Sequence, residues 1–334
     1  MSSPAAAPPV TLKDVAALAG VHPATASRAL RQAAHVADST AESVLRAART
    51  LRYVPDLAAA SLRTQRTRTA GVLAADLADP LVAPLLRGAE DALREAGYMM
   101  LAASAGHGRP RARDVLSGMH SRRADGVIFA GLARLPLPVA VCAGIPAAAA
   151  GHVSARLPSA STDLAGAAAL AAAHLAALGH RTAACIGCAR APLTLALLLA
   201  AARRAGLTVP PDLAVTAAAA TAEEGQRCCR DLLAAATAVT AIMTGSDLLA
   251  AGCCTALAAA GRPCPAAMSV TGFGDLPLSG SITPPLTTIR LPQYDVGAAA
   301  AGLLLAQLRQ PDEVAAADIR LNARLLPRQS TAQL

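Results

Sequence analysis

The sequence predicts an N-terminal all-α helix-turn-helix head followed by an α/β core of two lobes. Residues 11–53 contain three short amphipathic segments separated by tight turns, as in a small helical domain. From residue 70 onward, short apolar runs alternate with amphipathic helices, the pattern of a parallel sheet with helical crossovers. Residues 1–70 contain nine Lys and Arg against four Asp and Glu, a net +5 of the total +8. The positive charge is therefore concentrated in the head, where a polyanion would bind.

The first expected helix begins at Thr11. Thr11 and Asp14 fit a capping box, in which the Thr11 hydroxyl accepts the Asp14 backbone N–H and the Asp14 carboxylate faces the positive helix end. Gly20 ends the helix, because glycine readily adopts the left-handed conformation of a C-terminal cap. The side chains expected to share its apolar face are Val15, Leu18 and Ala19.

The second expected helix begins at Pro23, where the missing backbone N–H of proline costs nothing. Helical spacing turns one side of this segment toward the first helix and leaves the other side free. The two segments together predict a helix-turn-helix with a face that reads DNA. The inward side chains are Ala26, Ala29 and Leu30, and the outward ones are Pro23, Ala24, Ser27 and Arg28.

A third expected helix is capped by Asp38-Ser39-Thr40 and completes the head at Tyr53. The next segment, Asp56–Leu62, has helical propensity but is too short to be stable alone, since isolated helices need roughly 12–15 residues. It is either a plain linker or a helix that forms only against a partner, and Arg63–Thr69 is expected to be a tether. The side chains of the third helix that cover the other two are Val44, Leu45, Ala48 and Leu51.

The core is expected to contain two α/β units of similar size. Hydrophobic residues make up 54% of the chain but aromatic residues only 1%, so burial must come from Leu, Val, Ile and Ala, and we expect modest stability. Alanine runs such as 147–150 and 217–220 fit helix and strand equally well by propensity. The expected strands are 70–75, 98–103, 126–130, 147–150, 159–162, 182–186, 213–217, 238–244, 268–273 and 318–326. The expected helices are 81–97, 111–123, 164–178, 194–205, 223–235, 248–260 and 295–309.

Several stretches match one family of known proteins. In the head they are Thr11-Leu-Lys-Asp-Val-Ala-Ala-Leu-Ala-Gly-Val, Ala24-Thr-Ala-Ser-Arg-Ala-Leu, His35-Val36, Tyr53-Val-Pro55 and Ala59-Ala-Ser-Leu62. In the core they include Gly88-Ala-Glu-Asp-Ala-Leu, Ser246-Asp247-Leu-Leu-Ala-Ala-Gly and Pro284-Pro-Leu-Thr-Thr-Ile-Arg290. On these motifs the chain resembles the LacI/GalR family of transcriptional repressors. The resemblance implies a periplasmic-binding-protein-like core, in which a small molecule binds between two lobes and the chain crosses between them three times.

The resemblance also implies a domain organisation. Residues 1–10 are expected to be a disordered tip, 11–55 the DNA-binding head, 56–69 the hinge helix and linker, and 70–334 the effector-binding and dimerisation core. Lobe 1 would span about 70–163 and 291–318, and lobe 2 about 164–290 and 319–330. The implied hinge helix folds on operator DNA, pairs with its twin and inserts Leu62 into the minor groove, which kinks the duplex. Side-by-side lobes would form a homodimer, with Leu85, Ala89 and Ala92 on the interface helix.

Arg28 is the residue expected to read a base, since a guanidinium on the outer face of the second helix can bond guanine O6 and N7 together. Its alternative role is a phosphate clamp. Pro23 and Ala24 fall at positions that set base preference in the family and offer only apolar contact, for example with a thymine methyl. His22 stands where the family usually has a serine cap; it is poorer as a cap by roughly 1 kcal/mol and is expected to contact a phosphate or a base. Expected phosphate contacts are Thr11, Thr25, Ser27 and His35, and the DNA-binding set also includes Leu12, Arg31 and Leu62.

The effector anchors that the family implies are mostly replaced. Asp79-Pro-Leu-Val82 stands at an Asn-Pro-Phe-Phe-like stretch, Gly151-His152 at an Asp-Arg pair, and Thr194 at an arginine. Gly274 replaces the first acid of a Gly-Phe-Asp-Asp motif. The pair Ser246-Asp247 is retained, either as an effector anchor or only as a helix cap. The cleft therefore binds a sugar or sugar acid, takes a different effector, or is vestigial and replaced by a protein co-regulator. The candidate effector contacts are Asp79, His152, Thr194, Ser246, Asp247 and Asp275.

The sequence thus predicts a dimeric, ligand-modulated repressor that binds palindromic double-stranded DNA. A solute-binding protein of the same core fold would need an export signal and no head. An enzyme would need a motif such as Gly-x-Ser-x-Gly, His-Glu-x-x-His or a phosphate loop, so we expect no enzymatic activity, cofactor or metal. Cys185-Ile-Gly-Cys188 has metal-ligand spacing but no second pair, and we expect the eight cysteines to be buried and structural. With no membrane span, no signal peptide and no leucine heptad after the last strand, we expect a cytoplasmic dimer rather than a tetramer.

Overall fold

The computed structural model describes residues 10–30, 36–54, 66–106, 109–131, 145–152, 157–189, 191–235, 239–310 and 317–334. It divides the chain into two units, residues 1–67 and residues 68–334, each of which is described by itself. Four expectations fall outside the described residues: the tip before Val10, Arg31, His35 and the hinge segment Asp56–Leu62 with its leucine.

The first unit contains the three expected helices, α1 (Leu12–Ala19), α2 (Pro23–Leu30) and α3 (Asp38–Thr50). Gly20 ends α1 in the left-handed conformation, with φ of 68°. Leu18, expected in the apolar face of α1, is 55% exposed. It lies about 110° around the helix from the middle of the buried stripe, at roughly 100° per residue. The buried side chains that hold the three helices together are Val15, Ala16, Ala26, Ala29, Val44, Ala47 and Ala48.

The start of α3 differs from the expectation. Ala37 is the N-cap and makes no side-chain cap bond, and the helix already includes Asp38, Ser39 and Thr40. These polar residues form the first turn of α3 rather than its caps. Asp38 still stabilises the helix, because its carboxylate lies near the positive end of the helix dipole.

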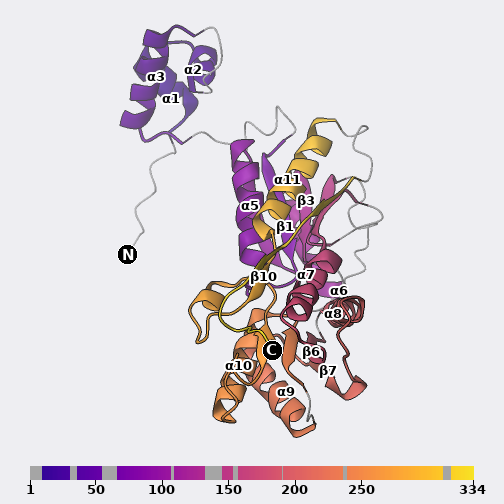
Figure 1. Ribbon diagram of the computed structural model, residues 1–334. Coiled ribbons are helices and arrows are strands. Elements are labelled where there is room, and N and C mark those ends of the chain that lie inside the picture. Colours follow the sequence, from indigo (N-terminus) through magenta and orange to yellow (C-terminus); the bar gives the residue numbers. More distant parts are fainter. Residues whose placement is uncertain are drawn as a thin grey trace, which may run out of the picture. The chain divides into compact units, whose positions relative to one another are not determined.

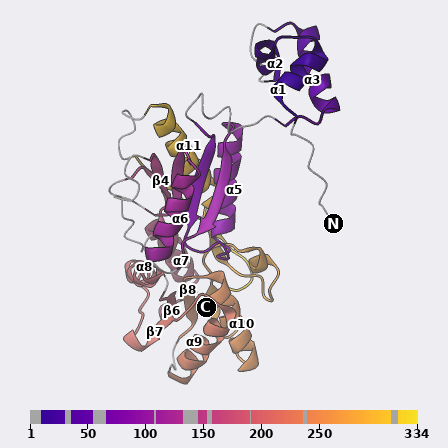
Figure 2. The same cartoon turned by 180° about the vertical axis from the view of Figure 1, so that it is seen from behind.

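Lobe 1 of the second unit is built on a six-stranded parallel sheet in the order β11-β5-β4-β3-β1-β2. Alternate residues of each strand point to opposite faces: Val72 and Ala74 pack against α5 and α11, while Leu73 packs against α6. Figures 1 and 2 show these helices on the two sides of the sheet. The elements are β1 (Thr69–Ala74), α5 (Val82–Glu95), β2 (Met99–Ser104), α6 (Arg109–Ser121), β3 (Gly126–Ala130), β4 (Ala147–Ala150), β5 (Ser159–Thr162), α11 (Gln293–Arg309) and β11 (Asp318–Leu321).

Helices α5 and α11 pack closely enough for their backbones to touch. A Cβ atom at Gly88 would overlap the carbonyl oxygen of Tyr294, and one at Gly297 would overlap that of Leu85. This contact buries Leu85 and Ala89, which are 2% and 0% exposed within the single chain. Those two side chains are therefore unavailable to a second copy, so their expected place at a dimer interface is wrong; Ala92, the third residue expected there, is half-buried.

Lobe 2 is built on a parallel sheet in the order β7-β6-β8-β9, with α7 and α8 on one face and α9 and α10 on the other. A short antiparallel pair, β10 and β12, lies beside it. The elements are α7 (Leu164–Ala177), β6 (Ala183–Cys188), α8 (Pro192–Arg204), η2 (Pro211–Leu213), β7 (Ala214–Ala217), α9 (Ala222–Ala235), β8 (Ala241–Thr244), α10 (Asp247–Ala259), β9 (Ser269–Thr271), η3 (Pro277–Gly280), β10 (Thr288–Arg290) and β12 (Arg324–Leu326).

The chain passes between the lobes at three places: from β5 to α7, from β10 to α11 and from β11 to β12. The last strand, expected to be continuous over residues 318–326, is divided by this third crossing. Asp318–Leu321 pairs with β5 in lobe 1, so lobe 1 extends to Leu321 rather than ending at 318. Each half is bonded to a different sheet, which the apolar pattern of one short segment cannot indicate.

Two histidines of lobe 2, the buried His180 and the half-buried His174, are bonded to hydroxyl groups. The ring of His180, only 2% exposed, has Nδ1 2.9 Å from Thr240 Oγ1 and Nε2 3.0 Å from Ser269 Oγ. His174 Nε2 lies 2.9 Å from Thr331 Oγ1 in the C-terminal segment. Burial lowers the pKa of both rings below the ordinary value of 6.5. Both histidines are therefore neutral hydrogen-bonding groups of lobe 2, and His180 lies in its interior.

We expect the free energy of unfolding to fall as the pH drops below about 6.5, the ordinary histidine pKa. The unfolded chain takes up protons there while buried His180 resists them, so its stabilising contribution is present above this pH and is lost on acidification, by up to about 1.4 kcal/mol per pH unit. His180→Gln should be less stable near neutrality and have a shallower pH slope in urea unfolding. Equal slopes for wild type and His180→Gln would contradict this assignment.

The cysteines that the structure describes are all buried, and none forms a disulfide. Burial raises the pKa of the Cys185 thiol to about 12, so this side chain of the Cys-x-x-Cys pair is far from a reactive thiolate. Within the described ranges, no three His, Cys, Asp or Glu side chains are grouped to hold a metal ion. No helix in that part of the chain is long and apolar enough to span a membrane.

Candidate DNA-reading face and interlobe site

The start of α1 forms the expected capping box. One carboxylate oxygen of Asp14 accepts both the Thr11 backbone N–H at 2.8 Å and the Thr11 hydroxyl at 2.7 Å. These hydrogen bonds lower the pKa of Asp14, the bond to the Thr11 backbone most and the bond to its hydroxyl next. A phosphate bound by the Thr11 hydroxyl would have to compete with this carboxylate. Leu12, the other expected contact here, is the first residue of α1.

Helix α2 presents two distinct faces. Ala26 and Ala29 are buried at 0% and 2% exposure, as expected, and fix the orientation of the helix in the head. The side chains of Ala24 and Arg28 are exposed on the opposite side, and no buried apolar group covers them. We call the outward surface of α2, with the residue before it, the DNA-reading face. Its side chains, exposed or half-buried, are His22, Pro23, Ala24, Thr25, Ser27 and Arg28.

His22 caps α2. Its Nδ1 accepts the Ala24 backbone N–H at 3.3 Å, and its carbonyl oxygen accepts the Thr25 and Ala26 N–H groups at 2.8 and 3.1 Å. The exposed ring therefore has a fixed place at the start of the second helix. The sequence indicated a weak cap at this position, and in the structure the ring Nδ1 and the carbonyl oxygen of His22 form it.

The expected effector contacts lie in several different environments. Asp79 is exposed and accepts the Leu81 backbone N–H at 2.9 Å, which caps the turn before α5. Thr194 is half-buried in the first turn of α8, beside Gly245, and Ser246 caps α10 by accepting the Leu248 N–H at 3.2 Å. A groove of about 760 Å³ lies beside α8, but none of the expected effector residues lines it.

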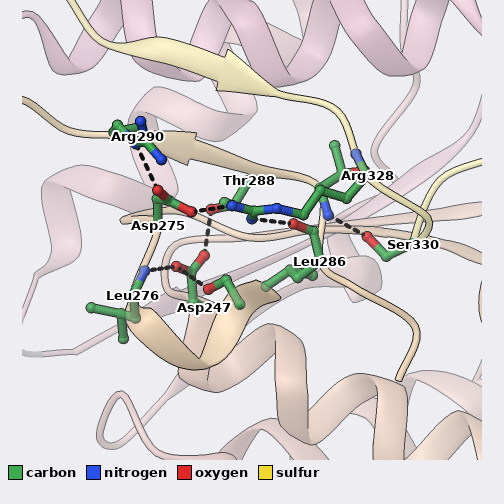
Figure 3. Close-up of polar contacts among 10 residues, drawn as sticks. Asp247, Asp275, Leu276, Leu286, Thr288, Arg290, Arg328 and Ser330 are labelled. Atoms are coloured by element: carbon green, nitrogen blue, oxygen red, sulfur yellow. Dashed lines mark hydrogen bonds and ion pairs between the residues drawn. The ribbon is translucent and has the colours of Figure 1, made fainter. Parts of the chain in front are cut away.

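Asp247 lies entirely inside lobe 2, at 0% exposure, in the first turn of α10. Its Oδ2 accepts the Leu276 backbone N–H at 2.6 Å and the Ser279 hydroxyl at 2.8 Å, and its Oδ1 accepts the Thr288 hydroxyl (Figure 3). The carboxylate thus connects α10, the loop 273–280 and β10. Three bonds from buried donors leave it little capacity to bind a ligand.

Asp275 is held between two arginines (Figure 3). Its Oδ2 lies 2.7 Å from Arg290 Nε and its Oδ1 lies 2.7 Å from an Arg328 guanidinium nitrogen. Burial alone would raise the pKa of this carboxyl, but the bonds from Arg328 and Arg290 outweigh it and the pKa is lowered. Arg290 ends β10 and Arg328 follows β12, so Asp275 ties the loop 273–280 to the two strands next to the second and third crossings between the lobes.

The lobes meet beside this loop. Leu81 of lobe 1 packs against the lobe 2 cluster that contains Phe273, and a Cβ at Gly274 would come within 3.1 Å of Leu81. Gly274 has φ of 135°, which disfavours the acid that the family motif has at this position. The replacement of that acid is therefore matched by the local backbone and packing.

A second set of polar atoms lies at the carboxyl ends of the lobe 1 strands, and the sequence indicated only one of them. In the described part of the chain, four buried side-chain atoms of this region have no hydrogen-bond partner. They follow β4, end β5 or begin α11, the edge at which open α/β sheets bind ligands. Burial lowers the pKa of His152, so this ring is a neutral hydrogen-bonding group. The four atoms are His152 Nδ1, Ser161 Oγ, Thr162 Oγ1 and Gln293 Oε1.

Comparison with known proteins matches both parts of the chain. Residues 11–56 match the model of the lacI family of bacterial regulatory proteins, and residues 172–331 match that of a periplasmic binding protein-like domain. The HTH-type transcriptional repressor CytR of Escherichia coli K12 is 30% identical over 97% of this chain and 97% of its own. Catabolite control protein A of Priestia megaterium is 29% identical over 96% and 99%.

Solved structures agree with these relatives. The lac repressor dimer bound to operator and the anti-inducer ONPF is similar with a TM-score of 0.83 and 27% identity, over 97% of this chain and 100% of that one. The transcriptional regulator CelR–cellobiose complex has a TM-score of 0.72 and 27% identity, over 96% and 99%. The expected fold, a helix-turn-helix head and a periplasmic-binding-protein-like core, is confirmed.

Proposed function

This chain belongs to the lacI family of bacterial regulatory proteins, and we propose that it is a repressor that binds a palindromic operator as a dimer under control of a small molecule. It is a DNA-binding transcriptional regulator with an effector-binding domain. The orientation of α2 supports the DNA-binding function: Ala26 and Ala29 are buried against the rest of the head, while Ala24 and Arg28 remain exposed. Its relatives are repressors, and we propose no enzymatic activity and a cytoplasmic site of action at the chromosome.

A selection of bound sites from random duplex DNA tests this function. We expect a palindrome whose half-sites are about one helical turn apart or a multiple of it, because each recognition helix covers only a few base pairs. Repeating the selection with sugars, sugar acids and other metabolites would show whether a ligand releases or strengthens binding. Recovery of no common sequence would contradict the proposal.

We place the dimer contact at the exposed edge of the lobe 1 sheet. Strand β2 ends that sheet, and it exposes two large apolar side chains, Met99 at 68% and Leu101 at 36%. Exposed apolar edge strands favour association with another chain. The similar lac repressor structure is of a dimer, which supports a second copy of this chain as the occupant.

Met99→Lys combined with Leu101→Lys is therefore expected to shift the protein toward monomer at micromolar concentration. The contact would lose the apolar burial of Met99 and Leu101, and the lysines of the two copies would repel one another across it. Operator affinity should fall with dimerisation, because the two heads would no longer be linked. Sedimentation measures the change, and Leu193→Lys, at a leucine of lobe 2 that is 61% exposed, is the matched control. A double variant that remains a dimer would show that the interface lies elsewhere.

For the effector, we propose a hydrogen-bonding small molecule at the carboxyl ends of the lobe 1 strands. The unpartnered buried atoms of His152, Thr162 and Gln293 support this site, and Asp79, Thr194 and Ser246 remain candidate contacts. We assign Asp247 and Asp275 to holding the loop 273–280. The cellobiose complex of a similar regulator makes a sugar one candidate class, and a sugar acid another.

The finer domain limits also remain proposals: a head at 11–55, a hinge at 56–69 with Leu62 as the minor-groove residue, and a core from residue 70. The remaining DNA contacts of this proposal are Thr11, Leu12, Thr25, Ser27, Arg31 and His35.

A further inference from the structure

Two cysteines of lobe 2 lie side by side because the chain turns back after α10. Cys254 is in the third turn of that helix. Gly261 then takes the left-handed conformation, with φ of 66°, and the Arg262 N–H donates to the Leu257 carbonyl oxygen at 2.9 Å. This reversal brings the Cys264 thiol into hydrogen-bond contact with the Cys254 thiol.

The contact makes the two thiols chemically unequal. The Cys264 hydrogen can face the Ser330 carbonyl oxygen, which lies 3.2 Å from Cys264 Sγ, or the Cys254 sulfur. A hydrogen bond from Cys264 lowers the pKa of Cys254 and raises the pKa of Cys264, because the shared hydrogen stabilises the thiolate of Cys254. Cys254 is therefore the nucleophile of the pair, and a protonated thiol lies next to it.

These two side chains are also the least buried of the cysteines that the structure describes. Cys254 is 6% exposed and Cys264 is 9% exposed, whereas Cys229 and Cys253 are both 0% exposed. Cys229 and Cys253 share the same kind of hydrogen bond between α9 and α10, so they form a matched pair that differs in access to solvent. A reactive, accessible cysteine with a second thiol beside it is the arrangement of a redox-sensing site.

We propose that Cys254 and Cys264 form a dithiol that hydrogen peroxide oxidises to a disulfide, and that this disulfide weakens operator binding. The Cys254 thiolate attacks one peroxide oxygen, the O–O bond breaks and hydroxide leaves, which gives a sulfenic acid. The Cys264 sulfur then attacks the Cys254 sulfur, the S–O bond breaks and water leaves. In total, the two thiols lose two electrons and two protons, and one peroxide becomes two molecules of water.

The effect on DNA binding rests on the proposed function and on the position of α10. A disulfide brings the two sulfurs to about 2.05 Å, closer than in hydrogen-bonded thiols, and removes the hydrogen that Cys264 donates to Ser330. The same helix begins at Asp247, which holds the loop 273–280 beside Leu81 of lobe 1. A shift of α10 therefore reaches the contact between the lobes, on which the placing of the two heads in the proposed dimer depends.

Alkylation of free thiols in the full chain, followed by mass spectrometry, tests the disulfide before and after peroxide treatment. We expect Cys254 and Cys264 to become protected together, with a loss of two hydrogens that dithiothreitol reverses, at least about tenfold faster than Cys229 and Cys253 react. The wild-type measurement needs no substitution, so it remains valid if a variant fails to fold. Free Cys254 and Cys264 after treatment, or a disulfide between other cysteines, would overturn the proposal.

Two variants check the order of the steps. In Cys264→Ser, a probe for sulfenic acid should label Cys254, because the thiol that completes the disulfide is gone. Cys229→Ser, in the matched buried pair, should form the Cys254–Cys264 disulfide at the wild-type rate. Labelling of Cys264 in Cys254→Ser, at a rate equal to that of Cys254 in Cys264→Ser, would contradict the assignment of Cys254 as the nucleophile.

Titration of the selected operator with the same samples tests the regulation. Oxidised wild type should bind roughly 5-fold or more weakly than reduced wild type, dithiothreitol should restore the affinity, and Cys254→Ser should keep its affinity in peroxide. Equal affinities of the reduced and the fully disulfide-bonded protein would overturn the regulatory role. Failure of the proposed function gives a different result, because the reduced protein would then prefer no operator over an unrelated duplex while the disulfide would still form.

Discussion

Arg28→Ala should weaken operator binding by roughly 1–3 kcal/mol and relax the preference at one base-pair position of each half-site. Arg28 is in the last turn of α2 and exposed, on the opposite side from the buried Ala26 and Ala29. From there a guanidinium can donate to O6 and N7 of one guanine, and alanine cannot. A binding-site selection repeated with the variant, together with titrations against single-substitution operators, measures both effects.

The controls for Arg28 separate base recognition from charge. Arg28→Lys keeps the charge but loses the two-pronged geometry, so it should retain general DNA affinity while losing part of the base preference. Arg46→Ala removes an exposed charge on α3, which is not part of the DNA-reading face as defined on α2, and should not change the base preference. If Arg28→Ala weakened every sequence equally, Arg28 would be a phosphate clamp and the assignment would be wrong.

The head could be predicted from sequence because its determinants are local. Gly20 and Pro23 mark the ends of adjacent helices, and Ala26 and Ala29 repeat at helical spacing, so the turn and the inward face follow from residues a few positions apart. Leu18 shows the limit of this reasoning. Several helix rotations fit an eight-residue segment, and only packing against the other two helices selects one.

The core was predictable in type but not in its long-range contacts. Propensity does not choose between helix and strand for Ala147–Ala150, and its place in the sheet depends on β3 and β5 on either side. The division of residues 318–326 between two sheets likewise depends on strands far away in the sequence. Burial of Leu85 and Ala89 depends on α11, about 200 residues later. Patterns within a short window contain none of this information.

The same limit applies to the interlobe residues. Asp247 and Asp275 stand at positions that suggested ligand binding, yet their partners lie 15 to 53 residues away in sequence. Gln293 drew no attention because nothing in its local sequence marks it, and its importance appears only as an unpaired buried oxygen. Whether a polar atom is buried without a partner depends on the tertiary structure, which a sequence motif does not show. Here the motifs point to Asp247 and Asp275, whereas the unpaired buried oxygen belongs to Gln293.

Asp247→Ala is expected to lower the free energy of unfolding by about 3 kcal/mol or more. It removes the acceptor of three buried donors, on Leu276, Ser279 and Thr288, and an unsatisfied buried donor costs about 1–3 kcal/mol. Asp247→Asn should lose less stability than Asp247→Ala, because the carbonyl oxygen of asparagine still accepts a hydrogen bond. It should still be less stable than wild type, because the amide N–H groups face the remaining donors. Urea unfolding of the three proteins measures the order, and hydrogen exchange at Leu276 should show loosening of the loop 273–280.

Gln293→Leu provides the contrast that separates a structural group from a ligand contact. Its Oε1 is buried without a partner in the described structure, so a leucine of similar size should leave stability unchanged within about 1 kcal/mol. Any metabolite that changes operator binding by wild type should affect this variant much less. Thermal shift and operator titration, each with and without that metabolite, measure the two properties separately. A strongly destabilised Gln293→Leu would make Gln293 a structural group, and an Asp247→Ala as stable as wild type would contradict the structural role assigned to Asp247.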